Sequence, residues 1–391
     1  MPHSAKVMNT MPRTPSIQHA ALAAHKKLRG KISIAPKARL KKIRDLSLYY
    51  TPGVAAVSSY LAQHKDQMRT YTMKGNTVAV ISDGSAVLGL GNIGPEGALP
   101  VMEGKALIFK EFANIDAFPI VLTTQDTDEI VKVVSAIAPV FGGINLEDIS
   151  APRCFEVEER LKRLLDIPVV HDDQHGTAVV VLAGLLNAMN VVGKKLVQSR
   201  IVISGAGAAG SAIADILLKK GVGDIILVDS KGIVSKSRDG LDQHKRQLAM
   251  QTNKKQLCGG LKEAFVGADI AIGVSKAGLF TKEYIKSMNA DPIIFAMANP
   301  TPEIMPDEAR AAGARIIATG RSDFPNQVNN ALVFPGLFRG ALDNHIRTVT
   351  DAMFIRAAEH LALLVTHPTV STIIPSIFDT RVVRTVAKSI K

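Results

Sequence analysis

The sequence has little cysteine, no long apolar run and almost no acid near its start. Only Cys154 and Cys258 occur in 391 residues, which excludes a disulfide framework and fits a reducing compartment such as the cytoplasm. No run of about 18 apolar residues occurs, so we expect no transmembrane helix, and the apolar segment of a secretory signal is also missing. Because 391 residues exceed what one core usually holds, two domains are expected.

The scarcity of acid is confined to the start of the chain. Residues 1–45 contain eleven Lys and Arg and a single acid, Asp45, within a net charge of +12. A disordered basic arm, a tail that binds anions or nucleic acid, and an organelle-targeting peptide are the three interpretations. No aromatic residue precedes Tyr49, so base stacking is unavailable, and few arginines precede Lys26. We expect residues 1–25 to form a disordered basic arm that leads into a basic helix, in a cytoplasmic protein.

Two pairs of adjacent acids follow short apolar runs. Glu147-Asp148 closes the run 144–146, and Asp172-Asp173 follows the run 168–170 and His171. Side chains that are neighbours in a strand point to opposite faces, so two adjacent acids share a target only where the strand has ended. Four acids held together repel one another unless a cation neutralises them. Oxygen ligands suit magnesium or manganese, although solvated loop acids are the alternative.

The pattern G-x-G-x-x-G occurs twice, and its context separates the two occurrences. Residues 205–210 follow the apolar run 200–204 directly, enter an apolar helix and precede a second strand that ends in Asp229. This is the dinucleotide fingerprint, in which glycines admit the pyrophosphate and the acid receives a ribose hydroxyl. The predicted cofactor-binding residues are Gly205, Gly207, Ala208, Ala209, Gly210, Asp229 and Asn299. Residues 89–94 lack such an acid and predict a tight turn that positions Lys105.

Strand-like and helix-like segments alternate along the chain, which predicts an α/β fold. Expected strands are 77–82, 119–124, 144–146, 200–204, 225–228, 270–274, 292–298 and 315–319; expected helices are 127–140, 151–165, 177–192, 211–218, 348–365 and 380–391. We expect an N-terminal catalytic and metal-binding domain over 26–170. A Rossmann-type domain with C-terminal helices should span 171–391, and the acids would lie in the cleft between the two domains.

Three further polar groups have competing interpretations. Asn299 and the pair Asn329-Asn330 follow strands and could cap helices or hold a carboxylate substrate. His171 and His175 suggest zinc, but this spacing serves zinc only on a helix. Tyr50 directly precedes Thr51-Pro52-Gly53, a turn that could hold its phenol in a cleft.

Taken together, these motifs resemble those of the malic enzymes, in particular the short bacterial form. The resemblance covers about residues 30–345 and rests on these stretches: 47–54 (SLYYTPGV), 83–94, 101–105 (VMEGK), 111–119, 142–149 (GGINLEDI), 171–177 (HDDQHGT), 205–210, 298–301 and 329–336. It implies oxidative decarboxylation of (S)-malate to pyruvate and CO₂ with reduction of NAD or NADP, together with decarboxylation of oxaloacetate.

Carried over residue by residue, the resemblance implies a role for each candidate. Glu147, Asp148 and Asp173 would ligate Mn²⁺ or Mg²⁺. Lys105 would be the general base, tuned by Asp172, and Tyr50 the general acid that protonates C3. Asn299, Asn329 and Asn330 would contact malate. A homodimer or higher homo-oligomer is implied, with neither membrane nor nucleic acid as an expected partner.

The sequence departs from the family pattern and leaves alternatives open. Ala86 stands where some longer members have a malate-binding arginine, Gly97 replaces an expected alanine, and the segment before Lys26 has no recognised counterpart. One alternative is a malolactic enzyme that keeps its NAD and releases lactate, and another is an anion- or RNA-binding protein on an enzyme scaffold. Asp229 slightly favours NAD, whereas Ser230, Lys231, Lys236 and Arg238 could pair with the 2′-phosphate of NADP.

Overall fold

A computed structural model describes residues 17–391, which form two compact units, one up to Arg39 and one from Leu40 to Lys391. In the first unit, α1 (Ile17–Leu28) has no buried residue. Residues 17–25, part of the expected disordered arm, lie in this helix, which the alanine-rich stretch 20–24 favours through its high helix propensity. The rest of that arm, residues 1–16, lies outside the described residues.

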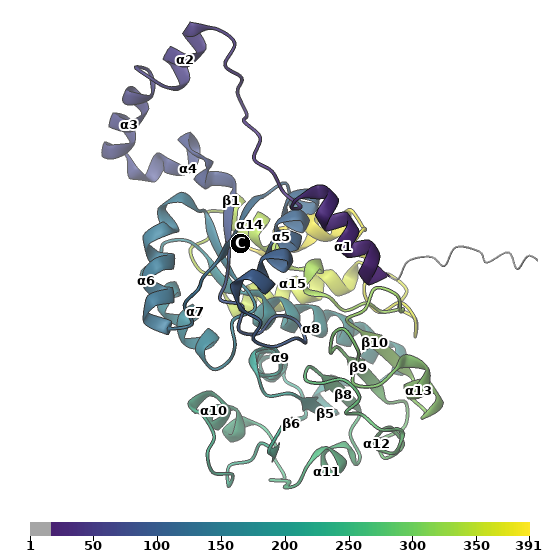
Figure 1. Cartoon of the computed structure of the whole chain (residues 1–391). Helices are drawn as coiled ribbons and strands as arrows, with labels where there is room; N and C mark the ends of the chain where they lie inside the picture. The colour runs from purple at the N-terminus through teal and green to yellow at the C-terminus, as the bar shows by residue number, and fades with distance from the viewer. Residues whose placement is uncertain (1–16) are drawn as a thin grey trace, which may run out of the picture. The chain divides into compact units, whose positions relative to one another are not determined.

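The second unit contains two sheets (Figure 1). The first sheet has the order β2-β1-β3-β4 and is parallel throughout. Its strands are β1 (Thr77–Ser82), β2 (Asp116–Val121), β3 (Gly143–Leu146) and β4 (Val169–His171). Every residue of β1 is buried, which explains its continuous apolar sequence, because helices cover both faces of a parallel sheet.

The second sheet has the order β10-β9-β8-β5-β6-β7, and only β7 is antiparallel among its described pairings. The strands are β5 (Arg200–Ser204), β6 (Asp224–Asp229), β7 (Gly232–Ile233), β8 (Ile270–Gly273), β9 (Ile293–Ala296) and β10 (Ile316–Thr319). From β5 the chain continues to β6 on one side and later to β8 on the other. This reversal creates the crevice at which Rossmann-type sheets bind their ligands. The expected two-domain α/β fold is confirmed.

The helices connect and cover the two sheets. Those of the first half are α2 (Ile43–Tyr49), α3 (Val54–Gln63), α4 (Met68–Tyr71), α5 (Gly94–Ala113), α6 (Thr127–Ile137), α7 (Arg153–Leu164) and α8 (Asp172–Val192). Those of the second half are α9 (Ala208–Lys219), α10 (Gln243–Gln251), α11 (Leu261–Phe265), α12 (Lys282–Lys286), α13 (Pro306–Ala311), α14 (Phe334–Asp343), α15 (Asp351–Leu363) and α16 (Arg381–Ser389). Single 3₁₀ turns occur at 65–67, 73–76, 138–140, 196–198 and 330–332.

Helix α8 joins the two sheets. It is long and apolar enough to cross a membrane by length and composition, but 67% of its most apolar stretch is buried in the protein. Residues 178–183 of α8 share one hydrophobic core with Val78 and Phe109 from the first half and Ile213 and Phe295 from the second. The first sheet ends at His171, close to residue 170 where a domain boundary was expected, and the second begins at Arg200, yet this shared core keeps both in one compact unit.

Two expected boundaries are corrected by the structure. Strand β2 begins at Asp116 rather than Pro119, because β2 is an edge strand and tolerates a proline in its interior. Helix α8 begins at Asp172 rather than Thr177, since two acids in the first turn interact well with the amino-terminal N–H groups. Gly176 belongs to this helix and makes room for an acid: a Cβ there would lie 2.0 Å from Oδ1 of Asp172.

Candidate active site

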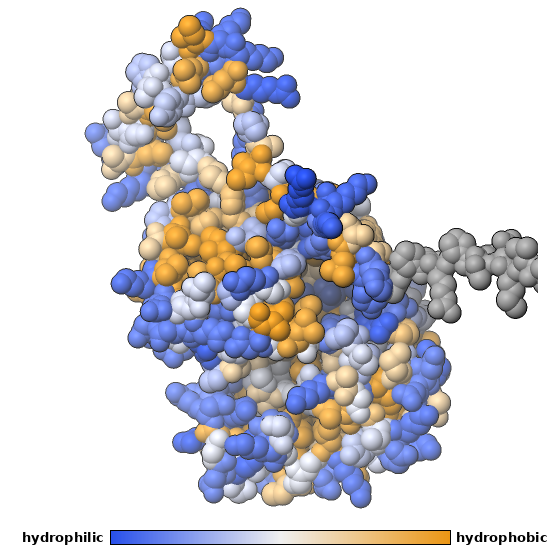
Figure 2. All heavy atoms as spheres, in the orientation of Figure 1, coloured by the Kyte–Doolittle hydropathy of each residue, from blue (hydrophilic) through white to orange (hydrophobic). Residues whose placement is uncertain are grey.

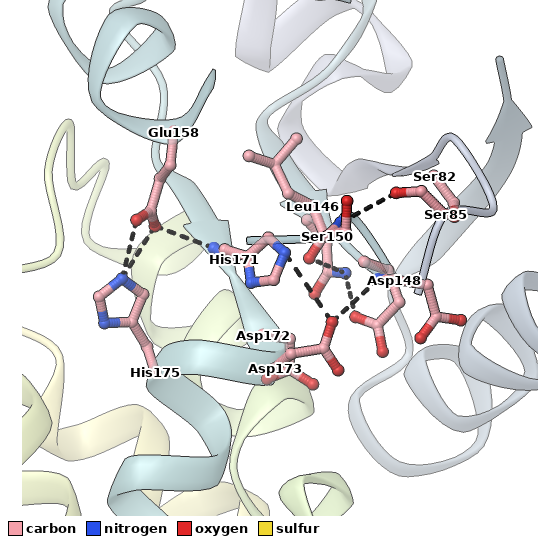
Figure 3. A network of polar contacts seen from close by, with 12 residues as sticks. Ser82, Ser85, Leu146, Asp148, Ser150, Glu158, His171, Asp172, Asp173 and His175 are labelled. Atoms are coloured by element: carbon pink, nitrogen blue, oxygen red, sulfur yellow. Dashed lines mark hydrogen bonds and ion pairs between the residues drawn. The ribbon is translucent and has the colours of Figure 1, made fainter. Parts of the chain in front are cut away.

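The two acid pairs meet at the carboxyl ends of β3 and β4 (Figure 3). One carboxylate oxygen from each of Glu147, Asp148 and Asp173 lies within 4.8 Å of the others. The backbone N–H of Asp148 donates to Oδ2 of Asp173 at 2.9 Å and fixes the distance between the two segments. Asp148 has a φ of 53°, a left-handed conformation that is costly for a residue other than glycine. This bend lets both acids of the first pair serve the same cluster.

The acids of the cluster outnumber its cations. Burial, followed by the charges of Asp173 and Glu147, raises the pKa of Asp148 to about 9. Its Oδ2 atom is buried and has no hydrogen-bond partner among the described residues. Three converging carboxylates with an unsatisfied oxygen fit a hard divalent cation, for which oxygen is the preferred ligand.

Lys105 reaches the cluster from α5. Its Nζ donates to Oδ2 of Asp172 at 2.5 Å, forms an ion pair with Glu147 and lies 4.4 Å from the ring centroid of Phe334. Burial by itself would lower the pKa of Lys105, but the charges of Asp172, Glu147 and Asp173 outweigh burial and raise it. With these acids ionised, Lys105 is therefore a proton donor, and it becomes a base only when their charge is neutralised.

Three amide side chains line the same cavity as Lys105. Asn299, Asn329 and Asn330 line a cavity of about 490 Å³ together with Lys105 and the three clustered acids. Asn329 also accepts the N–H of Ala331 at 2.9 Å, so it caps a short helix as well as lining the cavity. Among the described lining residues Lys105 is the one cation, and Ala86 lines the same cavity.

The first glycine motif forms part of the wall of this cavity. Residues 84–94 connect β1 to α5, and Leu88 and Gly89 line the cavity. A Cβ on Gly89 would lie 1.9 Å from the carbonyl oxygen of Asn299, so only glycine lets the turn contact that loop so closely. The segment therefore brings the two halves of the site together.

The second glycine motif lines a neighbouring cavity of about 710 Å³. Gly205, Ala206 and Gly207 line it between β5 and α9, and Asp229 and Ser230 line its far end. A Cβ on Gly210 would lie 1.7 Å from the carbonyl oxygen of Gly205, which explains the third glycine. Val274 and Ser275 line both cavities and Ala209 lines the 490 Å³ cavity, so a dinucleotide can extend from one to the other.

Asp229 has a partner that the sequence did not predict. Arg238 donates two hydrogen bonds to its carboxylate, at 2.9 and 2.6 Å, and Nζ of Lys245 donates a third at 3.2 Å. Burial would raise the pKa of Asp229, but the hydrogen bonds from Arg238, the backbone of Lys231 and Lys245 hold it below its usual value.

The structure does not bring Tyr50 into the cavity. This residue follows α2, is 63% exposed, and is absent from the described lining of the 490 Å³ cavity. Helices α2 to α4 contain no buried residue and project away from the sheets (Figure 1). The segment 43–73, which includes these helices, exposes many large apolar side chains (Figure 2): Ile43, Leu46, Leu48, Tyr49, Tyr50, Val54, Val57, Tyr60, Tyr71 and Met73.

The two histidines point to different partners (Figure 3). His175 bonds Glu158 through Nε2 at 3.0 Å, away from the cluster. His171 is fully buried, and its Nε2 lies 3.8 Å from Oδ2 of Asp173, beyond hydrogen-bond distance. Neither ring nitrogen of His171 has a hydrogen-bond partner among the described residues. The pair therefore does not form a zinc site.

Two residues that hold the site were missed in the sequence. Glu303 is fully buried and accepts the backbone N–H groups of Ser275 and Ala298, each at 3.0 Å, which ties together the loops after β8 and β9. Arg153 pairs with Asp83 at 2.8 Å beneath the β1–α5 turn. Glu303 is a single acid in a loop, which gives no signal in the sequence. Asp83 directly follows a buried strand, and an acid at such a position needs a cationic partner, so the sequence did contain a signal for Arg153.

The structure combines a parallel-sheet domain with a Rossmann-type domain, and a lysine lies among acids at their junction. These features together define a dinucleotide-dependent oxidoreductase. Residues 174–391 match the family model described as malic enzyme, NAD binding domain, and residues 29–127 and 123–162 match malic enzyme, N-terminal domain. The chain belongs to the malic enzyme family.

Individual relatives agree with this assignment over most of the chain. The bifunctional malic/malolactic enzyme of Bacillus subtilis is 53% identical over 378 residues, 96% of this chain and 92% of the relative. The NAD-dependent malic enzyme of Geobacillus stearothermophilus is 54% identical, over 92% of this chain and 76% of the relative. The crystal structure of the NAD-dependent malic enzyme of Thermotoga maritima, 49% identical, superposes with a TM-score of 0.92 over 95% of this chain and 98% of that chain.

Proposed function

We propose that this protein oxidatively decarboxylates (S)-malate to pyruvate and CO₂ while reducing NAD or NADP. The observation that carries the proposal is Lys105, bonded to Asp172 in an amide- and acid-lined cavity that adjoins the dinucleotide cavity at Val274 and Ser275. The names of the relatives support the substrate and the reaction.

Lys105 would accept the proton of the C2 hydroxyl, and a dinucleotide held in the neighbouring cavity would supply the hydride acceptor. The amine must be neutral for this step, but the surrounding acids raise the pKa of Lys105. Glu147, Asp148 and Asp173 would hold Mn²⁺ or Mg²⁺, whose charge offsets theirs, polarises the ketone and stabilises the enolate left by decarboxylation. Asn299, Asn329 and Asn330 donate N–H groups to the malate carboxylates.

A Lys105→Ala variant tests the assignment against a matched Lys110→Ala control. Lys110 lies on the same helix but bonds Asp116 and Asn114. We expect the first variant to lose roughly 10²–10⁴ in kcat for malate-dependent dinucleotide reduction, and the control to retain the parent rate. Equal rates for both variants would contradict the role of Lys105.

The malolactic reaction is a second candidate, favoured by the name of the Bacillus subtilis relative. In that reaction the bound nicotinamide returns hydride to pyruvate, and lactate leaves. Absorbance of the reduced cofactor and lactate are measured in the same reaction with malate and excess NAD. Reduced cofactor with pyruvate supports the oxidative reaction, whereas lactate without accumulation of reduced cofactor supports the malolactic one.

The proposal includes a homodimer in which Tyr50 of one copy supplies the general acid to the cavity of the other. Within one copy Tyr50 is exposed and the apolar side chains of α2 to α4 are unburied, and a second copy would cover both. The phenol would then protonate C3 after CO₂ has left.

Mixed dimers test this arrangement. Co-expressed Lys105→Ala and Tyr50→Phe chains form heterodimers in which one site has both an intact lysine and an intact tyrosine only when the tyrosine comes from the other copy. If the phenol acts across the interface, about a quarter of the parental activity returns in a random mixture. If each site uses its own tyrosine, the mixture is as inactive as the two separate variants.

A further inference from the structure

We propose that Asn326 is a positioning residue for malate, which holds the amides Asn329 and Asn330 in the substrate cavity without touching the substrate. By substrate cavity we mean the cavity of about 490 Å³ that those two amides line; Asn326 is absent from its described lining. The inference rests on the proposed reaction, in which the amides bind the malate carboxylates. It deepens that proposal by naming the residue that determines where the amides lie.

The side chain of Asn326 is buried and is bonded to backbone groups alone. Its Nδ2 donates to the carbonyl oxygens of Ile317 and Val370, at 3.0 and 2.9 Å. Its Oδ1 accepts the N–H of Ile373 at 2.9 Å. Both hydrogens of the amide are therefore engaged, and none is left for a ligand.

These bonds join two parts of the chain that are far apart in the sequence. Ile317 belongs to β10, whereas Val370 and Ile373 belong to the stretch that follows α15. The segment 369–372 within that stretch is closed on itself by two backbone hydrogen bonds of 3.1 Å between its ends. Asn326 has a φ of 56°, a left-handed conformation that asparagine tolerates better than most residues. Its side chain therefore fixes a closed turn to the sheet.

A short stretch beside the end of β10 connects Asn326 to the substrate amides. The N–H of Thr319 donates to the carbonyl oxygen of Asn326 at 3.3 Å. The N–H of Val328 donates in turn to the carbonyl oxygen of Thr319 at 2.8 Å. Asn329 is the next residue, so the place of its backbone follows from the place of Asn326.

A further cavity explains why the amides need this anchor. Asn329 lines the substrate cavity and also a cavity of about 270 Å³, which Asn326, Leu332 and Ile374 line as well. A side chain that borders open space on two sides lacks packing contacts there. Hydrogen bonds of the preceding chain, rather than packing, therefore keep Asn329 in its place.

The chain contains a matched control for this geometry. Asn253 is buried, has a φ of 51°, and donates through Nδ2 to the carbonyl oxygens of Val234 and Leu257, at 3.4 and 2.9 Å. Its Oδ1 accepts the N–H of Leu257 at 2.7 Å. Asn253 is absent from the described lining of both the substrate cavity and the 710 Å³ cavity. It therefore resembles Asn326 in structure but not in location.

Glycine substitutions at the two positions test the inference. Glycine adopts a positive φ freely, so Asn326→Gly and Asn253→Gly remove the side-chain bonds without straining the backbone. We expect both variants to unfold at similarly lowered temperatures. Asn326→Gly alone should raise KM for malate about 10- to 100-fold, the contribution of hydrogen bonds to a charged group. Its kcat and its KM for dinucleotide should stay within about twofold, because the amides bind substrate and transition state alike.

The outcomes separate this inference from the proposed reaction. If the parent oxidises malate but Asn326→Gly keeps the parental KM for malate, the inference is wrong and the reaction stands. Equal rises in KM for malate in the two glycine variants would also overturn it, since stability alone would then explain the effect. A parent that does not oxidise malate would overturn both proposals. If Asn326→Gly does not fold, Asn326→Asp and Asn253→Asp keep the shape of the side chain and give the same comparison.

Discussion

Acids follow strands in both sheets, at the ends of β3 and β4 in the first sheet and at the end of β6 in the second. These two places have opposite balances of positive and negative charge. At the ends of β3 and β4 the carboxylates outnumber their cation, Lys105, and the pKa of Asp148 rises to about 9. At the end of β6 a single acid, Asp229, has two cationic partners and a lowered pKa. The first place is short of positive charge and the second has a surplus. An acid at a strand end therefore indicates a ligand only once its partners are known.

Removing one acid from the first place should have the largest effect. Asp173→Asn takes away a full negative charge and one of three converging ligands. We expect Mn²⁺ affinity to fall more than about 100-fold, beyond the effect of losing a supporting residue, and turnover to fall with it, while dinucleotide binding persists. Calorimetric titration with Mn²⁺ measures this. Asp128→Asn, at an exposed acid on α6, is the control; unchanged affinity in Asp173→Asn would remove that residue from the ligand set.

His171 should show a smaller effect on the same affinity. Its buried ring lies beside Asp173 with no other described partner, so it limits where that carboxylate can move. His171→Asn should weaken Mn²⁺ binding about 10- to 100-fold, as loss of a supporting residue typically does. His175→Asn removes a ring that bonds Glu158 instead and should change thermal stability but not metal affinity. Equal losses in the two variants would mean that His171 only packs.

Glu303 ties together the loops after β8 and β9, which contribute Ser275 to both cavities and Ala298 to one, so a change there should have a moderate effect on both cavities. Glu303→Gln leaves one acceptor oxygen for the two N–H groups of Ser275 and Ala298, so one of them loses its partner. We expect a loss of about 1–3 kcal/mol in unfolding free energy, with raised KM for malate and for dinucleotide. Glu308→Gln, at an exposed acid on α13, is the control. A change in stability with both KM values unaltered would limit Glu303 to a structural role.

The smallest effect concerns Cys154, whose thiol is influenced by the charge of Asp173 in the acid cluster. Burial, followed by the charges of Asp173 and Glu158, raises the pKa of Cys154 to about 12, so very little thiolate exists at pH 8. Cys258 is exposed. A colorimetric thiol reagent should therefore modify one thiol in the native protein and two after denaturation, without loss of activity. Modification of both thiols before unfolding would show that the cluster does not shield Cys154.

Local patterns in the sequence were enough to predict much of this structure. Buried parallel strands such as β1 are continuous apolar runs, and the fingerprint at 205–210 is a contiguous segment, so both are visible without long-range information. The sequence also predicted that the two acid pairs come together, and they do so because β3 and β4 end at the same edge of the sheet. Proline in β2 and glycine in α8 concealed two element boundaries, since edge position and packing override local preference.

What the sequence could not predict depends on distant partners. Arg238 reaches Asp229 from a loop nine residues away, and Glu303 acts through backbone N–H groups that have no sequence signature. Tyr50 was chosen by its motif, but a motif does not say whether a side chain faces its own cavity. Which cation neutralises which acid is a tertiary property.

Helix α8 gives the two cavities a common mechanical element. Asp172 and Asp173 form its first turn, and its apolar body packs on α9, the helix that starts at the dinucleotide turn. Ala209 at the start of α9 lines the same cavity as Asp173, so a tilt of α8 that draws the acids together would also shift the dinucleotide turn next to them. Affinity for cation and for dinucleotide is then linked, and linkage is reciprocal: whichever binds first strengthens or weakens the second by the same factor.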